Sequence, residues 1–298
     1  MSRERVLRAM AAESVDVLLL GREGNARYVS GAHRLFLAGE RAFAPGCVVV
    51  RETGAVHLLS ATDFGVPQEL KHSHLYAPSW NPVTLIGRVA AVPGVASAAQ
   101  VGVDGLTPLF EALLASALPR ADLVDGESLM RAVRRVKSPE EVALIRAAAA
   151  VADATMAAAL DAVVNGEPDA TVKAVAMEIM ADQGVTTAAF EPRISRDGQR
   201  VAVAVGVLRE GWEADLARSV PGPARPESLD KAIHRCRPGT KVGDLAGTGL
   251  HGVGLGYEVL IPPDVLEPGM VLSIGADGAR DTVLVTDYSP EALTAPAL

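Results

Sequence analysis

One segment near the middle of the chain, VKSPEEVALIRAAAAVADATMAAALDAVVNG, carries the start and stop signals of a single long helix. Ser138 can cap the first turn, Pro139 suits the first helical position and Glu141 completes a capping box, while Asn165 and Gly166 end the helix. Its apolar residues recur at helical spacing and form one stripe, made of Val142, Ile145, Ala149, Ala152, Met156, Leu160 and Val163. This stripe predicts a core helix and not a cofactor surface.

The long helix marks a boundary between two domains, and 298 residues are enough for each domain to bury its own core. Residues 1–132 alternate helical and extended patterns, including a hairpin, CVVVRETGAVHLLS, that turns at Thr53 and Gly54. This alternation predicts a small α/β domain. In residues 133–298 a second helix near 169–183 precedes glycine-punctuated extended segments, which predict a mostly antiparallel sheet with its helices grouped apart from it. The predicted fold class is α+β.

Charge and composition exclude several classes of partner. The net charge is −8, and the longest basic run is the pair Arg134 and Arg135, so we expect no nucleic-acid partner. The N-terminal segment MSRERVLRAM lacks the pattern of a signal peptide, and we expect no membrane-spanning run, no membrane partner and a cytoplasmic location. Cys47 and Cys236 fit no metal or redox spacing and are expected to be reduced thiols. The HSH segment at 72–74 is expected to be a solvated loop.

Motifs along nearly the whole chain resemble, in one order, those of the creatinase, aminopeptidase P and methionine aminopeptidase family, whose catalytic domain has the pita-bread fold. NARYVSG is similar to a turn motif of the family's N-terminal domain, and RRVKSPEEVALIRAAA is similar to its domain-joining helix. RPGTKVGDL, HGVGLGYE, LEPGMVLSI, DTVLVTD and EALT follow in the family's order. The resemblance implies a creatinase-like N-terminal domain at 1–132, a shortened pita-bread domain at 133–298, and a homodimer.

The resemblance also implies two divalent cations held by two aspartates, a histidine and two glutamates. Asp215 matches the second aspartate and His251 matches the histidine, but Ala204, Gly275 and Arg280 stand at the other three positions. A guanidinium about 5 Å from a dication would repel it by roughly 6 kcal/mol at an effective dielectric constant of about 20. The sequence therefore predicts a degenerate metal site, with no metal and no cofactor.

The residues that remain suggest metal-independent chemistry on a small molecule. Creatinase is a metal-free member of the family that hydrolyses a small guanidino compound, although the histidine that it uses is missing from the shortened segment FEPRISRDGQRV. We interpret His251 as a general acid or base that Asp215 or Glu258 orients, and we expect these carboxylates to favour its charged form. Arg280 is interpreted as the group that binds a substrate carboxylate.

Trp212 and Tyr257 are further candidates for contact with the substrate, although both also fit a sheet face. Three hypotheses follow. The first, which we favour, is a metal-independent enzyme of hydrolase or lyase type that acts on a small amino-acid-like or amide substrate. The second is a non-catalytic pseudo-peptidase, in which Asp215 pairs with Arg280 in a salt-bridged core. The third is a metal-dependent Xaa-Pro aminopeptidase or prolidase with rearranged ligands drawn from Glu258, Asp277 and Asp281 together with Asp215 and His251.

Overall fold

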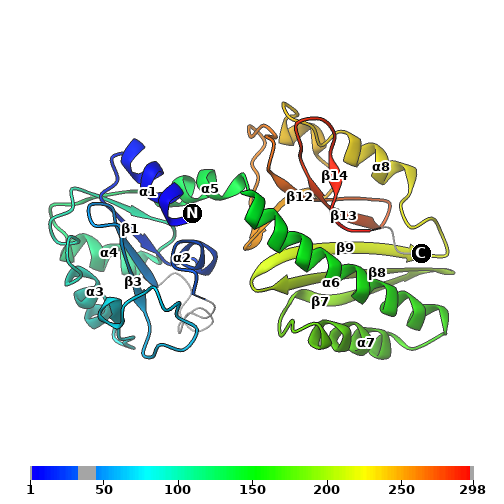
Figure 1. Cartoon of the computed structure of the whole chain (residues 1–298), viewed down its shortest axis with the longest axis horizontal. Coiled ribbons are helices and arrows are strands. Elements are labelled where there is room, and N and C mark those ends of the chain that lie inside the picture. Colours follow the sequence, from blue (N-terminus) through cyan, green and yellow to red (C-terminus); the bar gives the residue numbers. More distant parts are fainter. Residues whose placement is uncertain (1, 33–44, 296–298) are drawn as a thin grey trace. The chain divides into compact units, whose positions relative to one another are not determined.

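The computed structural model describes residues 2–32 and 45–295, and the chain divides into two compact units, Met1–Val133 and Arg134–Leu298 (Figure 1). Each unit has its own sheet and its own apolar core. The two units are therefore described separately.

The first unit contains a six-stranded mixed sheet of order β4-β3-β2-β1-β5-β6. Its strands are β1 (Val17–Leu20), β2 (Cys47–Val50), β3 (Ala55–Leu59), β4 (Leu75–Tyr76), β5 (Gln100–Val103) and β6 (Asp122–Asp125). Its helices are α1 (Ser2–Ala12), α2 (Glu23–Ser30), α3 (Pro82–Ala90), α4 (Pro108–Ala117) and α5 (Gly126–Arg135), of which α5 runs across the division between the units. Strands β2 and β3 form the predicted antiparallel hairpin around Thr53 and Gly54.

Two local predictions for this unit are wrong. The NARYVSG segment lies in helix α2 and not in a turn, and Asn25 on this helix donates a hydrogen bond to the buried carboxylate of Asp104 (Nδ2 to Oδ2, 2.8 Å). The HSH segment forms the short 3-10 helix η1 (His72–His74) and not a loop. His72 in this helix is exposed and hydrogen-bonds Asp63, whereas the His74 ring stacks on the buried ring of His57.

The second unit is an antiparallel sheet with three helices. Its strands are β7 (Ala188–Asp197), β8 (Arg200–Arg209), β9 (Trp212–Val220), β10 (His251–Gly254), β11 (Gly256–Glu258), β12 (Val271–Ala276), β13 (Ala279–Leu284) and β14 (Glu291–Ala292). The sheet order is β11-β10-β12-β13-β9-β8-β7, with β14 also paired to β13. The helices are α6 (Pro139–Val164), α7 (Asp169–Asp182) and α8 (Glu227–His234), and a 3-10 turn, η2, spans Val242–Leu245. The α+β class is confirmed.

Helix α6 has the predicted start and the predicted buried stripe. The Ser138 and Glu141 side chains form the capping box, and every residue of the stripe is buried. The expectation that no segment could span a membrane is wrong by length and composition, because α6 is long and apolar enough to do so. Its buried residues, however, pack with α7 and strands β8 and β9 as the main core of the unit, which makes α6 a core helix.

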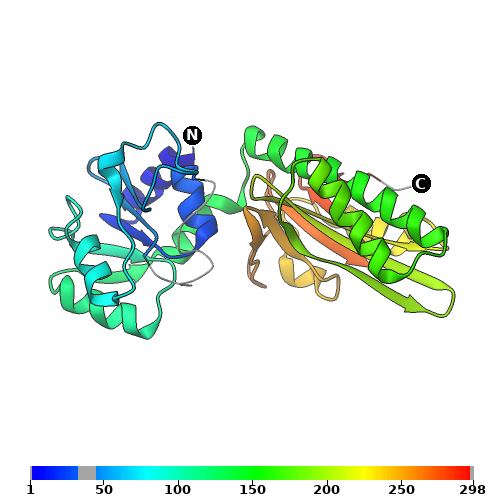
Figure 2. The ribbon, with the colours of Figure 1, turned by 90° about the horizontal axis from the view of Figure 1, so that it is seen from below.

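The helices also determine which face of the sheet carries polar groups. Helices α6 and α7 lie together on one side of β7, β8 and β9 (Figure 2), where they contact Ala214 and Leu216 of β9. Helix α8 packs against Leu272 and Ile274 of β12. Because successive side chains of a strand point to opposite faces, residues such as Asp215 lie on the other face of the sheet.

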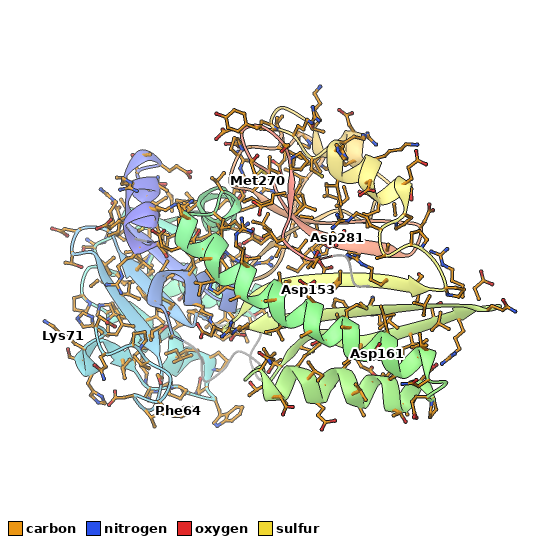
Figure 3. All side chains as sticks on the ribbon, turned by 45° about the vertical axis from the view of Figure 1, so that its right-hand side comes forward. Phe64, Lys71, Asp153, Asp161, Met270 and Asp281 are labelled. Atoms are coloured by element: carbon orange, nitrogen blue, oxygen red, sulfur yellow. The ribbon has the colours of Figure 1, made fainter. Side chains whose placement is uncertain are left out.

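A buried ionic cluster ties the last described residues to this sheet. Asp281 of β13 is fully buried and binds two arginines, with 2.6 Å from its Oδ1 to Arg218 Nη2 and 2.7 Å from its Oδ2 to Arg225 Nε. Thr294 Oγ1 donates to the same carboxylate, and Ala295 N donates to Asp153 of α6. Figure 3 labels Asp153 and Asp281 in this part of the structure. This cluster occupies Asp281 completely.

Candidate functional site

Two rows of residues cross the polar face of the second unit. In the first row, Gly206 pairs with Asp215, and Thr282 pairs with Ser273, which in turn pairs with His251. The two halves of this row meet at Thr282, whose Oγ1 accepts from Asp215 N at 3.0 Å and donates to Asp215 O at 2.9 Å. The sheet register therefore brings Asp215 and His251, 36 positions apart in the sequence, to the same place.

The second row lies next to the first and contains all three replaced positions. Ala204 of β8 pairs with Ala217 of β9, Ala217 pairs with Arg280 of β13, and Arg280 pairs with Gly275 of β12. The positions at which the resemblance implies three carboxylates thus lie together across four strands. Only Arg280 in this row has a polar side chain.

A hydrogen-bonded chain joins Arg280 to Asp215 through a serine. Arg280 Nη1 donates to Ser273 Oγ at 2.5 Å and to the Gly249 carbonyl at 3.1 Å. Ser273 Oγ donates in turn to Asp215 Oδ2 at 2.7 Å, and Arg280 Nη1 lies 3.8 Å from the same oxygen. Asp215 and Ser273 are buried, whereas the Arg280 side chain is 25% exposed. The cation can therefore be reached from solvent while its carboxylate partner cannot.

Glycines make the room that the guanidinium occupies. A Cβ atom added at Gly249 would lie 2.6 Å from Arg280 Nη2, and one added at Gly275 would lie 3.3 Å from the same atom. Gly249 also has a φ of +58°, which favours glycine over other residues. A side chain at position 275 would press on the Ala279 carbonyl, 3.1 Å from its Cβ, and on the Arg280 guanidinium, which would have to shift slightly.

His251 has a buried ring nitrogen with no partner. Within the described part of the chain, its Nε2 makes no hydrogen bond, and it lies 3.8 Å from Asp215 Oδ2. Burial lowers the pKa of His251; Asp215 opposes this change and Arg280 adds to it. Asp215 thus favours the charged imidazole, as expected of a neighbouring carboxylate, but desolvation outweighs this single carboxylate and the net pKa is lowered.

Glu258 does not orient His251. It pairs with Gly252, the residue next to His251, so its side chain lies on the opposite face of the strands. There it forms ion pairs with Arg134 Nη2 at 3.1 Å and with the buried Lys137 Nζ at 2.6 Å. The role predicted for Glu258 conflicts with this geometry, and a structural role in holding the start of α6 to the sheet replaces it.

The two aromatic candidates have different positions. Tyr257 is 64% exposed and stacks on the His251 ring, with 4.6 Å between the ring centroids, so it adjoins the site. Trp212 packs instead into a core cluster with Val142, Ile145 and Val253. Its predicted contact with substrate is therefore not supported by its position.

Glu213 is a residue that the sequence analysis missed. It alternates with Asp215 in the strand segment WEADLARS, so both side chains lie on the same face, and this alternation was the available signal. Glu213 is 5% exposed, and within the described residues it makes no hydrogen bond and no ion pair. Burial, followed by the charges of Asp215 and Glu258, raises the pKa of Glu213 to about 7, while Arg280 opposes the change.

The side chains at the site do not form an evident metal-binding group. In residues 2–32 and 45–295, no three or more histidine, cysteine, aspartate or glutamate side chains are grouped so that they could hold a metal ion. Two members of the rearranged set already have partners within the chain, since Asp281 is engaged by two arginines and Glu258 by Arg134 and Lys137. Asp277 accepts a hydrogen bond from Ser228 at the far end of the hairpin.

Comparisons with known proteins agree with this architecture. Residues 3–136 match the Creatinase/Prolidase N-terminal domain family. An Xaa-Pro dipeptidase of Pyrococcus horikoshii is 22% identical over an alignment 352 positions long, which covers 98% of this chain and 96% of that protein. Among solved structures, the prolidase of P. horikoshii OT3 has a TM-score of 0.76 at 19% identity, covering 99% of this chain and 98% of its own.

The similarity extends to aminopeptidases. The X-Pro aminopeptidase of Thermotoga maritima MSB8 has a TM-score of 0.74 at 14% identity, covering 98% of this chain and 97% of its own. At these identities the structural similarity establishes the fold and leaves the activity open. The first domain therefore matches the Creatinase/Prolidase N-terminal domain model over residues 3–136, and the whole chain has the pita-bread fold of the prolidases and aminopeptidase P, in a shortened form.

Proposed function

We propose that the second domain is a metal-independent enzyme site for a small amino-acid-like or amide compound that carries a carboxylate. The observation that carries this proposal is the position of the Arg280 guanidinium. Arg280 lies in the row of the three replaced positions and is linked through Ser273 to Asp215, the aspartate that remains from the implied ligand set. A fixed cation there supplies positive charge without a metal ion. The same charge disfavours a dication beside Asp215.

The remaining side chains supply binding and proton transfer. Arg280 is partly exposed and can bind a carboxylate through guanidinium donors that its bonds to Ser273 and Gly249 leave unused. His251, neutral because of its burial, can hold or accept a proton at the unpartnered Nε2. Tyr257 covers one face of this ring. We further propose that the protein is cytoplasmic and dimeric, in keeping with the resemblance to its family.

A second candidate function is a non-catalytic binding protein. The observation that favours it is that Arg280 already hydrogen-bonds Ser273 and Gly249, and Asp215 already accepts from Ser273. Such a closed network resembles a structural core more than a reacting centre. Both candidates would bind the small molecule, but only the first would convert it into a product.

Metal content tests the central claim. The purified chain would be dialysed against manganese, cobalt or zinc and its metal measured by elemental analysis, alongside a His251→Ala variant and a triple variant, Ala204→Asp, Gly275→Glu and Arg280→Glu. We expect the wild-type chain to retain no stoichiometric metal, and the triple variant to gain metal because it restores the five-ligand set that the resemblance implies. About two ions per wild-type chain, lost in His251→Ala, would overturn the proposal in favour of a metal-dependent peptidase like the Xaa-Pro dipeptidase relative.

Activity is then measured on the metal-free chain. Dipeptides, amino-acid amides and N-acyl amino acids would be incubated with the protein and the products identified by mass spectrometry. Turnover that falls at least 100-fold in His251→Asn and Arg280→Met supports the enzyme. Binding of these compounds without turnover would identify the chain as the non-catalytic candidate.

A further inference from the structure

We propose that a cavity of the first unit is a second small-molecule site, which binds a carboxylate with an apolar body through Arg88, His57 and His74. This inference does not rest on the function proposed for the second unit. The ligand class that it names has a carboxylate at one end and an apolar ring at the other.

The first observation is the cavity itself. It lies among β3, β4, η1 and the end of α3, and its volume is about 620 Å³. Binding pockets for small molecules have volumes of roughly 300–1,000 Å³. Tyr76 and Val92 line the cavity and also belong to the buried core of the unit, and Leu75 and Pro93 add to its apolar wall. The apolar body of a ligand can therefore be buried here.

The second observation is the charge that Arg88 supplies. Its Nη1 donates to the Pro78 carbonyl at 2.7 Å and also to the Ala77 carbonyl, so the chain after β4 holds the guanidinium in place. Nε and Nη2 donate to no described residue, which leaves donors for a ligand. No aspartate or glutamate is among the described residues that line the cavity. The cavity therefore favours an anion, and a carboxylate matches the paired donors of a guanidinium.

The third observation is a pair of imidazoles. The rings of His57 and His74 both line the cavity and stack on each other, with 4.5 Å between their centroids. His57 is 8% exposed, and no residue in the described part of the chain hydrogen-bonds either ring. Neither ring has a nitrogen that is sealed from solvent without a partner, so these nitrogens remain accessible. Burial lowers the pKa of His57 to about 4, so near neutral pH this ring can both donate and accept a hydrogen bond.

These observations together select the ligand class. An amine would meet the like charge of Arg88, and a neutral molecule would leave that charge without a counter-ion. A bare anion such as phosphate would leave the apolar wall in contact with water. A carboxylate with an apolar body satisfies both parts of the cavity.

Three probes test this inference by calorimetry on the full-length chain. These are 3-phenylpropanoate, its neutral amide, and pentanoate, which lacks the ring. We expect 3-phenylpropanoate to bind at least tenfold more tightly than either of the others. Arg88→Met should weaken its binding at least tenfold and remove the preference for the acid over the amide. The matched control is Arg120→Met, which removes an exposed cation of the same unit outside the cavity.

A second variant leaves Arg88 in place, because the loss of Arg88 also frees the chain after β4. Ala91 is exposed and lines the cavity, so Ala91→Phe places a ring at its rim and should weaken binding of 3-phenylpropanoate at least tenfold. Ala96→Phe adds the same ring at an exposed position away from the cavity and should leave binding within twofold.

Nitrogen NMR signals of the histidine side chains locate the bound probe, once they are assigned with His57→Gln and His74→Gln. We expect 3-phenylpropanoate to shift the signals of His57 and His74 but not that of His251. A shift of His251 alone, with binding lost in Arg280→Met, would place the probe in the second unit and refute the inference while supporting the carboxylate site proposed there. Equal or absent binding of the three probes, or unchanged binding in both Arg88→Met and Ala91→Phe, would refute the inference and leave the proposed function standing.

Discussion

His57 shows how burial sets the charge of a single side chain in the first unit. Its ring is 8% exposed and stacks on His74 with 4.5 Å between centroids. Burial, assisted by the neighbouring His74, lowers the pKa of His57 to about 4. Asp104 in the same unit shows the opposite effect on an acid, since burial raises its pKa to about 6 despite hydrogen bonds from Asn25 and Gly21. The two groups act on stability in opposite directions.

We predict that His57 makes the first unit less stable as the pH falls from about 6.5 to 4. In this window the unfolded histidine binds a proton that the folded one does not, so unfolding is favoured by about 2–3 kcal/mol. Asp104 opposes this loss because its folded form binds a proton near pH 6 and its unfolded form does not. The quantity to measure is therefore the difference between the wild-type chain and His57→Gln in urea unfolding at pH 7.5, 5.5 and 4.5.

The control for His57 is a histidine of the same unit. His72→Gln changes an exposed ring and should leave the pH profile of the wild-type chain unchanged. A His57→Gln profile that runs parallel to the wild-type profile would show that His57 titrates normally in the folded state.

Gly249 allows a second prediction at this scale. It has both a positive φ and a close contact with Arg280, whereas nearby Gly247 has the positive φ alone. Both Gly249 and Gly247 have a positive φ, but only a Cβ at Gly249 would meet the Arg280 guanidinium. We expect Gly247→Ala to cost about 1 kcal/mol for backbone strain alone, and Gly249→Ala to cost more and to weaken ligand binding by Arg280 as well. Chemical denaturation and pentanoate calorimetry measure the two effects. Equal stability losses, with binding intact in both variants, would contradict this arrangement.

At the scale of elements, local signals predicted some features and could not predict others. The capping box, Pro139 and the apolar stripe of α6 are all encoded within that helix, so its start and buried face follow from the sequence. The site is different, because Glu258 and His251 are seven residues apart and yet point to opposite faces of paired strands. The sequence analysis also missed Ser273 and Thr282, because their hydrogen bonds to Asp215 run from one strand to another. Their importance appears only when β12, β13 and β9 are in register.

The start of α6 provides a test at this scale. Ser138 Oγ accepts from Glu141 N, and Glu141 Oε2 accepts from Ser138 N. We expect Ser138→Ala to lower the free energy of unfolding of the second unit by about 1 kcal/mol, because one backbone donor of the first turn loses its partner. Ser138→Thr should retain most of the stability. Thermal or urea unfolding measures both variants, and an unchanged midpoint for Ser138→Ala would show that the cap contributes nothing.

For the whole molecule, the two units have separate cores. The core of the first unit joins α3 and α4 to its mixed sheet, and every residue that is part of that cluster or packs against it lies at or before Leu123. Helix α5 is joined to α1 by a hydrogen bond from Arg5 Nη2 to the Val133 carbonyl, 2.5 Å long. We predict that residues 1–135 fold alone, with a cooperative thermal transition by circular dichroism. A broad transition, together with strong binding of a hydrophobic dye, would show that the first unit depends on the second.

The pairing of Gly275 with Arg280 has a consequence for how this site could be changed back into a metal centre. A carboxylate introduced at position 275 alone would meet the guanidinium that now fills its space, and Arg280→Glu alone would leave Asp215 without its nearest cation. Either single step passes through a less favourable intermediate, so the two positions are coupled and must change together. A library of single substitutions would thus find no route back to metal binding, whereas a library of paired substitutions at 275 and 280, made together with Ala204→Asp, could.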